Sequence, residues 1–260
     1  MRDLNFSKIS SKLIEFISLE VSARGFQKAI LGLSGGLDSC VVAVLAKEAL
    51  GANLRTLYLP SPNSSKEGLV HALLLSKLFE IPCEVRSIGA LQEVFARENS
   101  LSDPSPENRL RLGNACARFR MIILYDVALN EERLVIGTSN KSELALGYGT
   151  IYGDTAYALN PLGNLYKSEV FELARFLKIP KEVIEKPPSA DFFEGQSDEN
   201  ELGFGYNELD KVLIEHMENC LSVEELLAKG YAPKLVDTVV QRVLKSQFKR
   251  EMPPLASIEI

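Results

Sequence analysis

Residues 28–40, KAILGLSGGLDSC, form the stretch that decides the expected fold. The short apolar run at 29–33 is typical of a buried parallel strand, and residues 40–50 carry apolar side chains at helical spacing. The glycine pair at 35–36 lets the backbone bend sharply and approach a ligand closely. Backbone amides at the start of the helix would point at an anion. The stretch therefore predicts a strand, an anion-binding loop and a helix.

Asp38 indicates a metal ion in this loop. A carboxylate about 5 Å from a phosphate oxygen costs about 3 kcal/mol at an effective dielectric constant of ~20. A magnesium ion held by one or two carboxylates and by phosphate oxygens turns this repulsion into attraction. The loop lacks the third glycine of a dinucleotide fingerprint and the lysine of a Walker A loop. The alternative is that Ser34 or Asp38 merely caps the helix.

The totals for the whole chain narrow its class. Its 260 residues allow one large α/β domain or two small ones, and 46% hydrophobic and 25% charged residues are ordinary for a globular protein. A net charge of -6 argues against a nucleic-acid surface. Four scattered cysteines without a C-x-x-C pair indicate a reducing compartment. With neither a signal-like start nor an apolar run of membrane length, a cytoplasmic location is expected.

Strands and helices are expected to alternate along the chain. Such alternation predicts an α/β fold, a Rossmann-like parallel sheet with right-handed crossovers flanked by helices, and additional helices follow towards the C-terminus. The polar run at 98–108 is expected to be a loop. Further strands are expected at 53–59, 83–88 and 133–137, and further helices at 4–23, 69–79, 109–130 and 167–177.

The expected helix at 109–130 carries two features of interest. Its segment 121–124 is apolar on every side and predicts burial all round, either as a central core helix or beneath a second subunit. Arg118 and Arg120 point in nearly opposite directions on a helix, so the two arginines must have different roles. Solvent exposure is the ordinary alternative to ligand binding for either one.

A second polar cluster follows the expected strand at 133–137. Ligands of open α/β sheets bind beyond the carboxyl ends of the strands, so Thr138 could reach a nucleotide and Glu143 could supply a second carboxylate for magnesium. The alternative is a capping box, with Ser139 or Asn140 as the helix cap and Glu143 in the first turn. From this segment alone both interpretations stand.

Three later features point to the same site. Lys167 begins a helix, where the helix dipole disfavours a cation, so an anion is expected nearby. The stretch 146–161 is rich in glycine and tyrosine and predicts either a shaped binding loop or plain turns. The polar, acidic run at 186–205 is interpreted as a mobile lid, with an exposed linker as the alternative.

The loop sequence SGGLDS resembles that of the ATP pyrophosphatases, which cleave ATP between its α- and β-phosphates. The ordered set of motifs narrows this resemblance to the NAD synthetase family, and the match runs from about residue 28 to residue 254. The motifs are SGGLDS at 34–39, GNACARFRM at 113–121, GTSNKSE at 137–143, YGD at 152–154, NPLGNLYK at 160–167, KPPSAD at 186–191 and FKREMPP from 248.

The resemblance implies an adenine nucleotide alpha hydrolase-like fold and one domain over residues 1–260. This domain would comprise an ATP-pyrophosphatase core at 25–180, the lid at 186–205 and a helical extension at 206–260. The implied reaction joins ammonia to nicotinic acid adenine dinucleotide, called deamido-NAD, with ATP as co-substrate and Mg²⁺ as cofactor. An acyl-adenylate would be the intermediate, and a homodimer the assembly.

Site residues carry over from the family position by position. Asp38 and Glu143 would hold magnesium, and we hypothesise that Asp154 attracts ammonium and helps remove its proton. The chain departs from the family pattern at Ile151 and Ala158, where many members have Lys and Asp, and Phe248 replaces a common histidine. The implied ATP contacts are Gly32, Leu33, Ser34, Gly35, Gly36, Leu37, Asp38, Ser39, Thr138, Lys167 and Ser189, and the implied substrate contacts are Arg118, Phe248 and Lys249.

Two rival functions are weighed against this one. A tRNA-thiolating pyrophosphatase would need reactive cysteines and a basic surface for RNA. The sequence indicates neither feature. A non-catalytic ATP sensor would not need Glu143 and Lys167 in addition to the loop. Free ammonia is expected as the nitrogen source, because the chain leaves no room for a glutamine-hydrolysing domain. A separate glutaminase subunit stays open.

Overall fold

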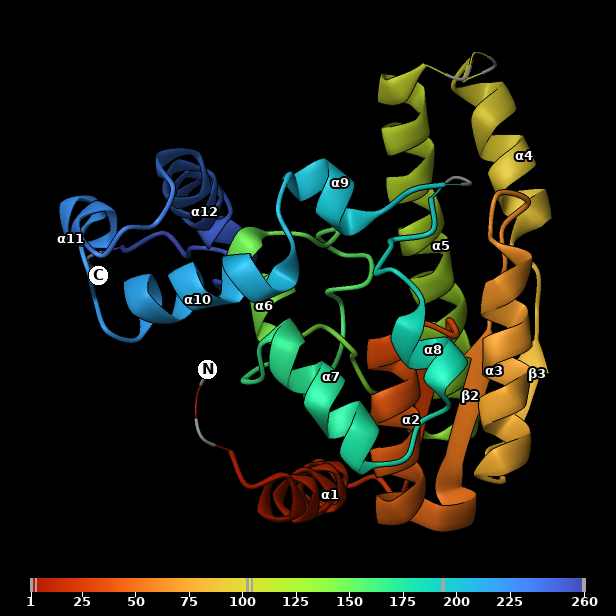
Figure 1. Ribbon diagram of the computed structural model, residues 1–260. Helices are drawn as coiled ribbons and strands as arrows, with labels where there is room; N and C mark the ends of the chain where they lie inside the picture. Colours follow the sequence, from red (N-terminus) through yellow and green to blue (C-terminus); the bar gives the residue numbers. More distant parts are fainter. Residues whose placement is uncertain (1, 3, 102, 104, 193–194, 259–260) are drawn as a thin grey trace.

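Figure 1 shows the computed structural model of the protein, which describes residues 2, 4–101, 103, 105–192 and 195–258. Within these residues, four strands form a parallel sheet with the order β3-β2-β1-β4. The expected α/β class with a parallel, Rossmann-like sheet is confirmed. The strands are β1 (Lys28–Gly32), β2 (Leu54–Tyr58), β3 (Cys83–Val85) and β4 (Arg133–Val135).

Helices alternate with the strands and then continue beyond the sheet (Figure 1). They are α1 (Phe6–Ala23), α2 (Leu37–Leu50), α3 (Lys66–Leu78), α4 (Gly89–Glu98), α5 (Pro106–Glu131), α6 (Lys141–Leu146), α7 (Lys167–Phe176), α8 (Lys181–Glu185), α9 (Asp198–Leu202), α10 (Tyr206–Met217), α11 (Val223–Ala228) and α12 (Pro233–Lys245), with short 3-10 helices at Gly51–Asn53 and Gln247–Lys249.

Some element boundaries differ from the expected ones. Helix α2 begins at Leu37, before the residue that apolar spacing predicts, because Asp38 is favourable in the first turn of a helix. The sequence pattern did not predict α4, which starts at Gly89 without a side-chain cap to mark it. Residues 198–202, within the expected lid, are helical, and Phe193 and Glu194 of that lid lie outside the described residues.

Helices cover both faces of the sheet. Ala29 and Leu31 of β1 join a buried cluster with α1, α2 and α7. Ile30, which points to the opposite face, clusters with Met121 and Leu124 of α5. Because both faces are covered, the middle of β1, Ala29 to Leu31, is apolar and buried, as parallel strands usually are.

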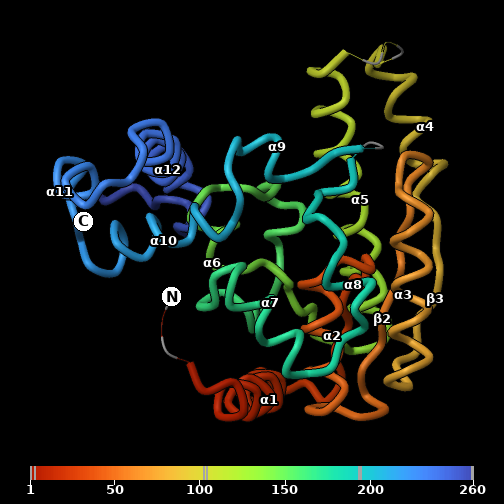
Figure 2. Tube along the Cα trace, viewed as in Figure 1, coloured from red at the N-terminus to blue at the C-terminus, as the bar shows by residue number. Residues whose placement is uncertain are grey.

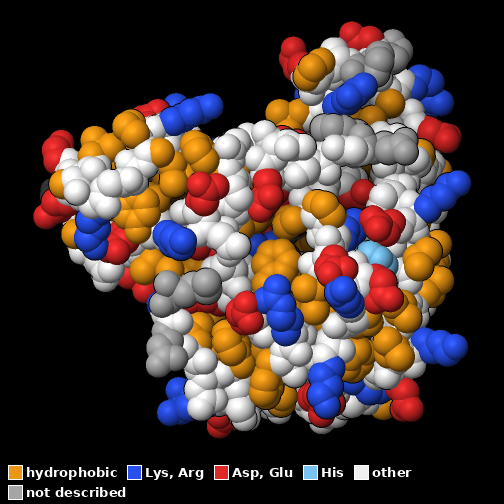
Figure 3. Space-filling model, viewed as in Figure 1, with side chains coloured by type: hydrophobic (Ala, Val, Ile, Leu, Met, Phe, Trp, Pro, Cys, Tyr) orange, Lys and Arg blue, Asp and Glu red, His pale blue; other side chains and the backbone are white. Residues whose placement is uncertain are grey.

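The C-terminal helices α10, α11 and α12 have a core of their own. That core also takes in Ala145 and Leu146 of α6, so the extension is fastened next to the loop that leaves β4. Figures 2 and 3 show this extension on one side and the upper parts of α4 and α5 on the other, both standing clear of the body. Among the described helices, none has the length and apolar character needed to cross a membrane.

Helix α5 is buried on one face only. Met121 and Leu124 pack against the sheet, but Ile122 is 61% exposed and Leu129 is 84% exposed. The expectation that segment 121–124 lies in a central core is therefore wrong for the single chain. Tyr125 belongs to the same exposed stripe, at 43% exposure. What remains of the prediction is its alternative, a surface that a second subunit could cover.

Candidate functional site

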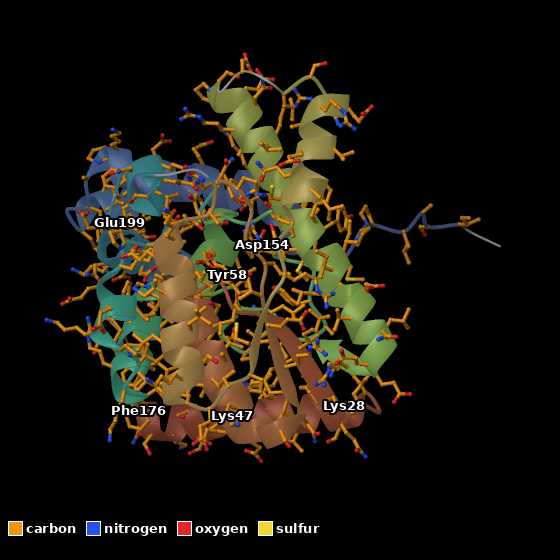
Figure 4. All side chains as sticks on the ribbon, turned by 90° about the vertical axis from the view of Figure 1, so that its right-hand side faces the viewer. Lys28, Lys47, Tyr58, Asp154, Phe176 and Glu199 are labelled. Carbon is orange, nitrogen blue, oxygen red and sulfur yellow. The ribbon has the colours of Figure 1, made fainter. Side chains whose placement is uncertain are left out.

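The candidate site lies beyond the carboxyl ends of the strands. Strands β2 and β3 follow β1 on one side of the sheet, and β4 lies on the other side of β1. The strand order therefore reverses at β1, which makes the strand ends there a usual place for a ligand. A cavity of about 630 Å³ opens there, within the usual range for small-molecule sites. Figure 4 shows Tyr58, which ends β2, and Asp154 near the middle of the view, and Lys28, which begins β1, near its lower edge.

The loop between β1 and α2 is held by its own side chains and by α3. Ser34 N donates to Ser39 Oγ at 3.2 Å, and Gly36 N donates to Ser34 Oγ at 3.2 Å. Gly35 has φ +76°, and a Cβ there would lie 2.0 Å from the Gly68 carbonyl oxygen. Only glycine fits this approach. No side chain caps α2, so the alternative that Ser34 or Asp38 serves as its cap is not borne out.

Lys167 lies between two carboxylates inside the cavity. Its Nζ pairs with Asp38 Oδ2 and lies 3.4 Å from Glu143 Oε1, and its side chain is 4% exposed. Burial lowers the pKa of Lys167, but the negative charges of Asp38 and Glu143 outweigh burial and raise it overall. The anion that the sequence demanded near this helix start is therefore present, supplied by the protein itself.

Glu143 serves as a cap and as a pocket group at once. Its Oε2 accepts from Asn140 N at 3.1 Å, and Asn140 Oδ1 accepts from Glu143 N at 3.0 Å, which completes a capping box. Asn140 also donates from Nδ2 to Asp38 Oδ1 at 2.9 Å. Burial and the negative charge of Asp38 raise the pKa of Glu143 to about 8. The capping interpretation is confirmed, and it leaves Oε1 facing Lys167.

The residues present fit a magnesium ion that is shared with a nucleotide. Among the described residues, no group of three or more His, Cys, Asp or Glu side chains could hold a metal alone. Magnesium ordinarily takes only one or two carboxylates in addition to phosphate oxygens and water. Asp38 and Glu143 provide that number, both close to Lys167. Their crowding, seen in the raised pKa of Glu143, would be relieved by a cation.

Asp154 lies in the cavity wall, in the turn that follows α6. Its Oδ1 accepts from Thr150 N at 2.8 Å, and Thr150 Oγ1 donates to Asn114 Oδ1 at 2.7 Å. The residue is exposed, and its side chain faces the cavity. Neighbouring protein atoms displace part of the water around the carboxyl group, which raises the pKa of Asp154.

The structure brings most of the candidate residues into one cavity, but not all of them. Arg118 is exposed on α5, where its Nε donates to the Ile151 carbonyl at 3.3 Å, and Phe248 is 60% exposed. Gly35 shapes the loop without lining the cavity. The candidates that line it are Gly32, Leu33, Ser34, Gly36, Leu37, Asp38, Ser39, Thr138, Glu143, Asp154, Lys167, Ser189 and Lys249.

Six further charged residues line the cavity and were not singled out as site residues: Arg120, Lys186, Asp191, Asp198, Glu201 and Arg242. Arg120 donates to the Leu59 carbonyl at 2.9 Å, and its opposition to Arg118 on the helix was the available signal. Lys186 and Asp198 lie within the expected lid at 186–205. Asp198 Oδ1 is buried with no hydrogen-bond partner among the described residues, which no sequence pattern could have indicated.

The parallel sheet, the glycine-rich loop and the charged cavity at the strand ends define the class of nucleotide-binding α/β proteins. The model of the NAD synthase family matches residues 9–253 of the chain. The chain therefore belongs to the NAD synthase family, and the resemblance drawn from its motifs is confirmed.

Individual relatives agree with this membership. The NH₃-dependent NAD⁺ synthetase of Wolinella succinogenes is 55% identical over 254 residues, covering 98% of this chain and 97% of that protein. The structure of an NH₃-dependent NAD synthetase from Campylobacter jejuni has a TM-score of 0.82 at 37% identity and covers 98% of this chain and 100% of that one. The structure of an NMN synthetase from Francisella tularensis has a TM-score of 0.85 at 33% identity, with the same coverage.

Proposed function

We propose that the protein catalyses the ATP-dependent amidation of deamido-NAD by ammonia, with NAD, AMP and pyrophosphate as products. Membership of the NAD synthase family supports this reaction. The observation that carries the proposal is the position of Lys167 between Asp38 and Glu143, beside the glycine-rich loop and inside the cavity. Such an arrangement offers a fixed cation, carboxylates and backbone amides to a triphosphate.

The carboxylate of deamido-NAD must first become a better electrophile. Its oxygen attacks the α-phosphorus of ATP, the bond to pyrophosphate breaks, and an acyl-adenylate forms. Loop 32–39 holds the phosphates, and Thr138 and Ser189 contact ATP from the cavity wall. Lys167, whose pKa is raised, stays protonated and stabilises the charge of the departing pyrophosphate.

Asp38 and Glu143 are the proposed ligands of Mg²⁺, which adds positive charge next to the phosphates when it is bound. Asn140 orients Asp38 through its amide hydrogen bond of 2.9 Å. The capping box fixes the backbone of Glu143 at the first turn of α6. Both carboxylates are thus held on helix starts, so little side-chain freedom is lost when a cation binds.

Amination is the second step. Ammonium dominates over ammonia in neutral solution, and Asp154 attracts it electrostatically and accepts its proton. The free ammonia attacks the activated carbonyl, a carbon-nitrogen bond forms, the nitrogen loses one further proton to water, and AMP leaves with the oxygen that had attacked phosphorus. The raised pKa of Asp154 makes its carboxylate a better proton acceptor than an ordinary one.

Substrate binding is proposed to involve two copies of the chain. Lys249 lines the cavity of its own chain, with Nζ 2.8 Å from the carbonyl oxygens of Gly147 and Gly149. Arg118 and Phe248 lie outside that cavity, so they reach deamido-NAD most simply across a subunit interface.

A homodimer is proposed because Arg118 shares its helix face with the exposed apolar stripe. Residues 118, 122, 125 and 129 follow helical spacing along the outer side of α5. A stripe with exposures up to 84% is costly in water and is buried best by its own copy in a twofold dimer. The dimer would place Arg118 next to the interface between the two subunits.

The test is incubation of the purified protein with ATP, Mg²⁺, ammonium and deamido-NAD, followed for AMP and NAD by chromatography. We expect AMP and NAD in equal amounts, and no NAD when ammonium is omitted. Failure to form AMP or NAD under these conditions would favour a non-catalytic ATP sensor. Asp38→Asn should abolish both products, because it removes a proposed metal ligand.

A second candidate is synthesis of NMN from its deamido mononucleotide. The high structural similarity to an NMN synthetase favours it, as do Ile151 and Ala158, which lack the charges that many family members offer a dinucleotide. The same assay with the mononucleotide in place of deamido-NAD separates the two. The first proposal requires the higher kcat/KM with deamido-NAD.

The remaining features of the proposal concern the nitrogen source and the cellular location. Free ammonia is the proposed nitrogen source. The cytoplasm is the proposed location, supported by four cysteines that are all free.

A further inference from the structure

The start of helix α3 lies against the glycine-rich loop and is capped in an unusual way. Ser65 is its N-cap, and Ser65 Oγ accepts from Gly68 N at 3.3 Å. In a complete capping box, the residue at the third helical position returns a carboxylate to the N-cap amide. Helices α6 and α11 have this arrangement, with Glu143 and Glu225 in that position. In α3 the position is Gly68, which has no side chain to offer.

Packing against the glycine-rich loop explains why this position is glycine. A Cβ on Gly35 would lie 2.0 Å from the Gly68 carbonyl oxygen, and a Cβ on Gly68 would lie 3.0 Å from the Ser34 carbonyl oxygen. The two backbones approach so closely that a glutamate could not be placed there without moving the loop. The Ser65 amide must therefore find its acceptor elsewhere.

Asp191 supplies the missing carboxylate from 126 residues away. Ser65 N lies 3.1 Å from Asp191 Oδ1 and 3.1 Å from Oδ2. Lys186 approaches the same serine, with Nζ 3.2 Å from Ser65 Oγ. Both charged residues of the 186–192 segment thus converge on Ser65. Between them lies Ser189, whose Oγ accepts from Asp191 N at 3.0 Å.

A second contact fixes the same segment to α5. A Cβ on Gly113 would lie 2.2 Å from the ring of Phe192, so the ring sits directly on the helix backbone. Figure 2 shows the chain after α8 running across to α5. The segment that carries Ser189 is therefore attached both at α3 and at α5.

We infer that Asp191 is a positioning residue for ATP binding, because it completes the capping box of α3 from a distant part of the chain and so sets Ser189 in the cavity wall. This inference rests on the proposed function, in which Ser189 contacts ATP. Through Ser65, Asp191 also ties the segment to the first turn of α3, where Gly68 packs against the glycine-rich loop. Two walls of the ATP site thus share one attachment.

Two substitutions separate the carboxylate from the backbone conformation. Asp191 has φ +54°, a left-handed conformation that glycine adopts without strain and asparagine tolerates. Asp191→Gly removes the acceptor, and Asp191→Asn keeps a carbonyl acceptor. We expect Asp191→Gly to weaken binding of α,β-methylene-ATP with Mg²⁺, measured by calorimetry, by roughly tenfold, and Asp191→Asn by no more than about threefold.

Glu225→Ala is the matched control. It removes an equivalent bond, from Ser222 N to Glu225 Oε2 at 2.8 Å, on a helix that lies away from the cavity. We expect a lower Tm with unchanged nucleotide affinity. Equal affinity losses in Glu225→Ala and Asp191→Gly would mean that Asp191 acts only through general stability, which overturns the inference.

Hydrogen exchange of the Ser65 amide provides a readout that needs no ligand. We expect faster exchange at Ser65 in Asp191→Gly than in the wild type, with the wild-type rate nearly kept in Asp191→Asn, as measured by NMR. An unchanged rate in Asp191→Gly overturns the inference. If the wild type did not bind the nucleotide, the proposed function would fail, but the exchange experiment would still decide whether Asp191 holds this segment.

Discussion

Lys167 lies at the start of a helix and also between two carboxylates. The negative charge of these carboxylates explains why a cation is tolerated at the helix start. Its side chain is 4% exposed between Asp38 and Glu143. Lys167→Met keeps much of the volume but leaves two carboxylates opposed without a cation. We expect kcat to fall by about 10²–10³-fold, because a donor to the departing pyrophosphate is lost. Steady-state release of AMP measures the effect.

Lys167→Arg is the matched variant, since it keeps the charge. Thermal unfolding adds an independent check. Mg²⁺ should raise the Tm of Lys167→Met more than that of the wild type, because the unpaired carboxylates then lack any other cation. An equal gain in both proteins would contradict the placement of magnesium at Asp38 and Glu143.

Asp154 is expected to show a trade between stability and activity. Partial loss of water in the cavity wall raises its pKa, so the folded protein holds this proton more tightly than the unfolded chain. The stabilisation that comes from binding this proton is fully present below the pKa that Asp154 has in the unfolded chain. It is lost as the pH rises through the pKa that Asp154 has in the folded protein. Asp154→Asn should therefore have a higher Tm than the wild type at neutral pH. The difference should shrink as the pH falls towards about 4, the ordinary carboxyl pKa.

The same Asp154→Asn variant should aminate the adenylate about 10²–10⁴-fold more slowly, because its amide cannot accept the proton of ammonium. Rapid-quench measurement of NAD formation in a single turnover isolates this step. A normal amination rate would refute the role of Asp154, whatever happens to the Tm.

Individual residues show which parts of the site could be predicted from the sequence alone. The conflict between Lys167 and the helix dipole predicts a nearby anion, but its identity depends on Asp38, which is 129 residues away. Glu143 fits two interpretations, and the structure shows that capping and pocket exposure coexist. Asp191 was seen only as part of a motif, since its bond to Ser65 spans 126 residues.

At the scale of elements, the loop between β1 and α2 depends on its contact with α3. Gly35→Ala would place a Cβ 2.0 Å from the Gly68 carbonyl oxygen at φ +76°. Gly25 has φ +80° with open space around it, so Gly25→Ala carries the conformational cost alone, about 1–2 kcal/mol. We expect Gly35→Ala to lose more stability than Gly25→Ala in urea unfolding.

Nucleotide affinity distinguishes these two glycines further. Gly35→Ala should lose measurable ATP binding, while Gly25→Ala should keep the wild-type affinity. Equal stability and equal affinity in the two variants would show that the loop tolerates displacement from α3.

Helix starts explain which elements the sequence could place. Asn140 carries recognisable start chemistry, and α6 begins where the capping alternative places it, while α7 begins at Lys167 as expected. Helix α4 begins at Gly89 with no capping side chain, and its apolar residues Leu91 and Val94 are half exposed. Such a helix depends on its contact with α5 rather than on local signals, so periodicity alone does not mark it.

At the scale of the whole molecule, the unpaired surface of α5 predicts assembly. Ile122→Asp places a charge in the exposed apolar stripe and should shift the protein from dimer to monomer in sedimentation velocity. Leu19→Asp is the control, because Leu19 is 59% exposed on α1 and outside the stripe. A monomeric wild type, or a dimer that survives Ile122→Asp, would contradict the proposed interface.

The alternation of strands and helices predicts the overall architecture, but it does not predict which strands pair with each other. Strands separated by helices predict a parallel sheet, and the apolar run at 29–33 predicts a buried strand. The order β3-β2-β1-β4 depends on contacts between distant segments, such as Lys28 with Arg133. Likewise, Ile122 reads as a core residue in sequence, and only the packed chain shows that its face is left open.

The central claim is that the carboxylate of deamido-NAD is adenylated in this cavity before ammonia attacks. Deamido-NAD carrying a heavy oxygen isotope in both carboxylate oxygens tests it directly, with AMP and pyrophosphate analysed by mass spectrometry after turnover. The account predicts one labelled oxygen in each AMP and none in pyrophosphate. Unlabelled AMP, or label in pyrophosphate, would contradict it.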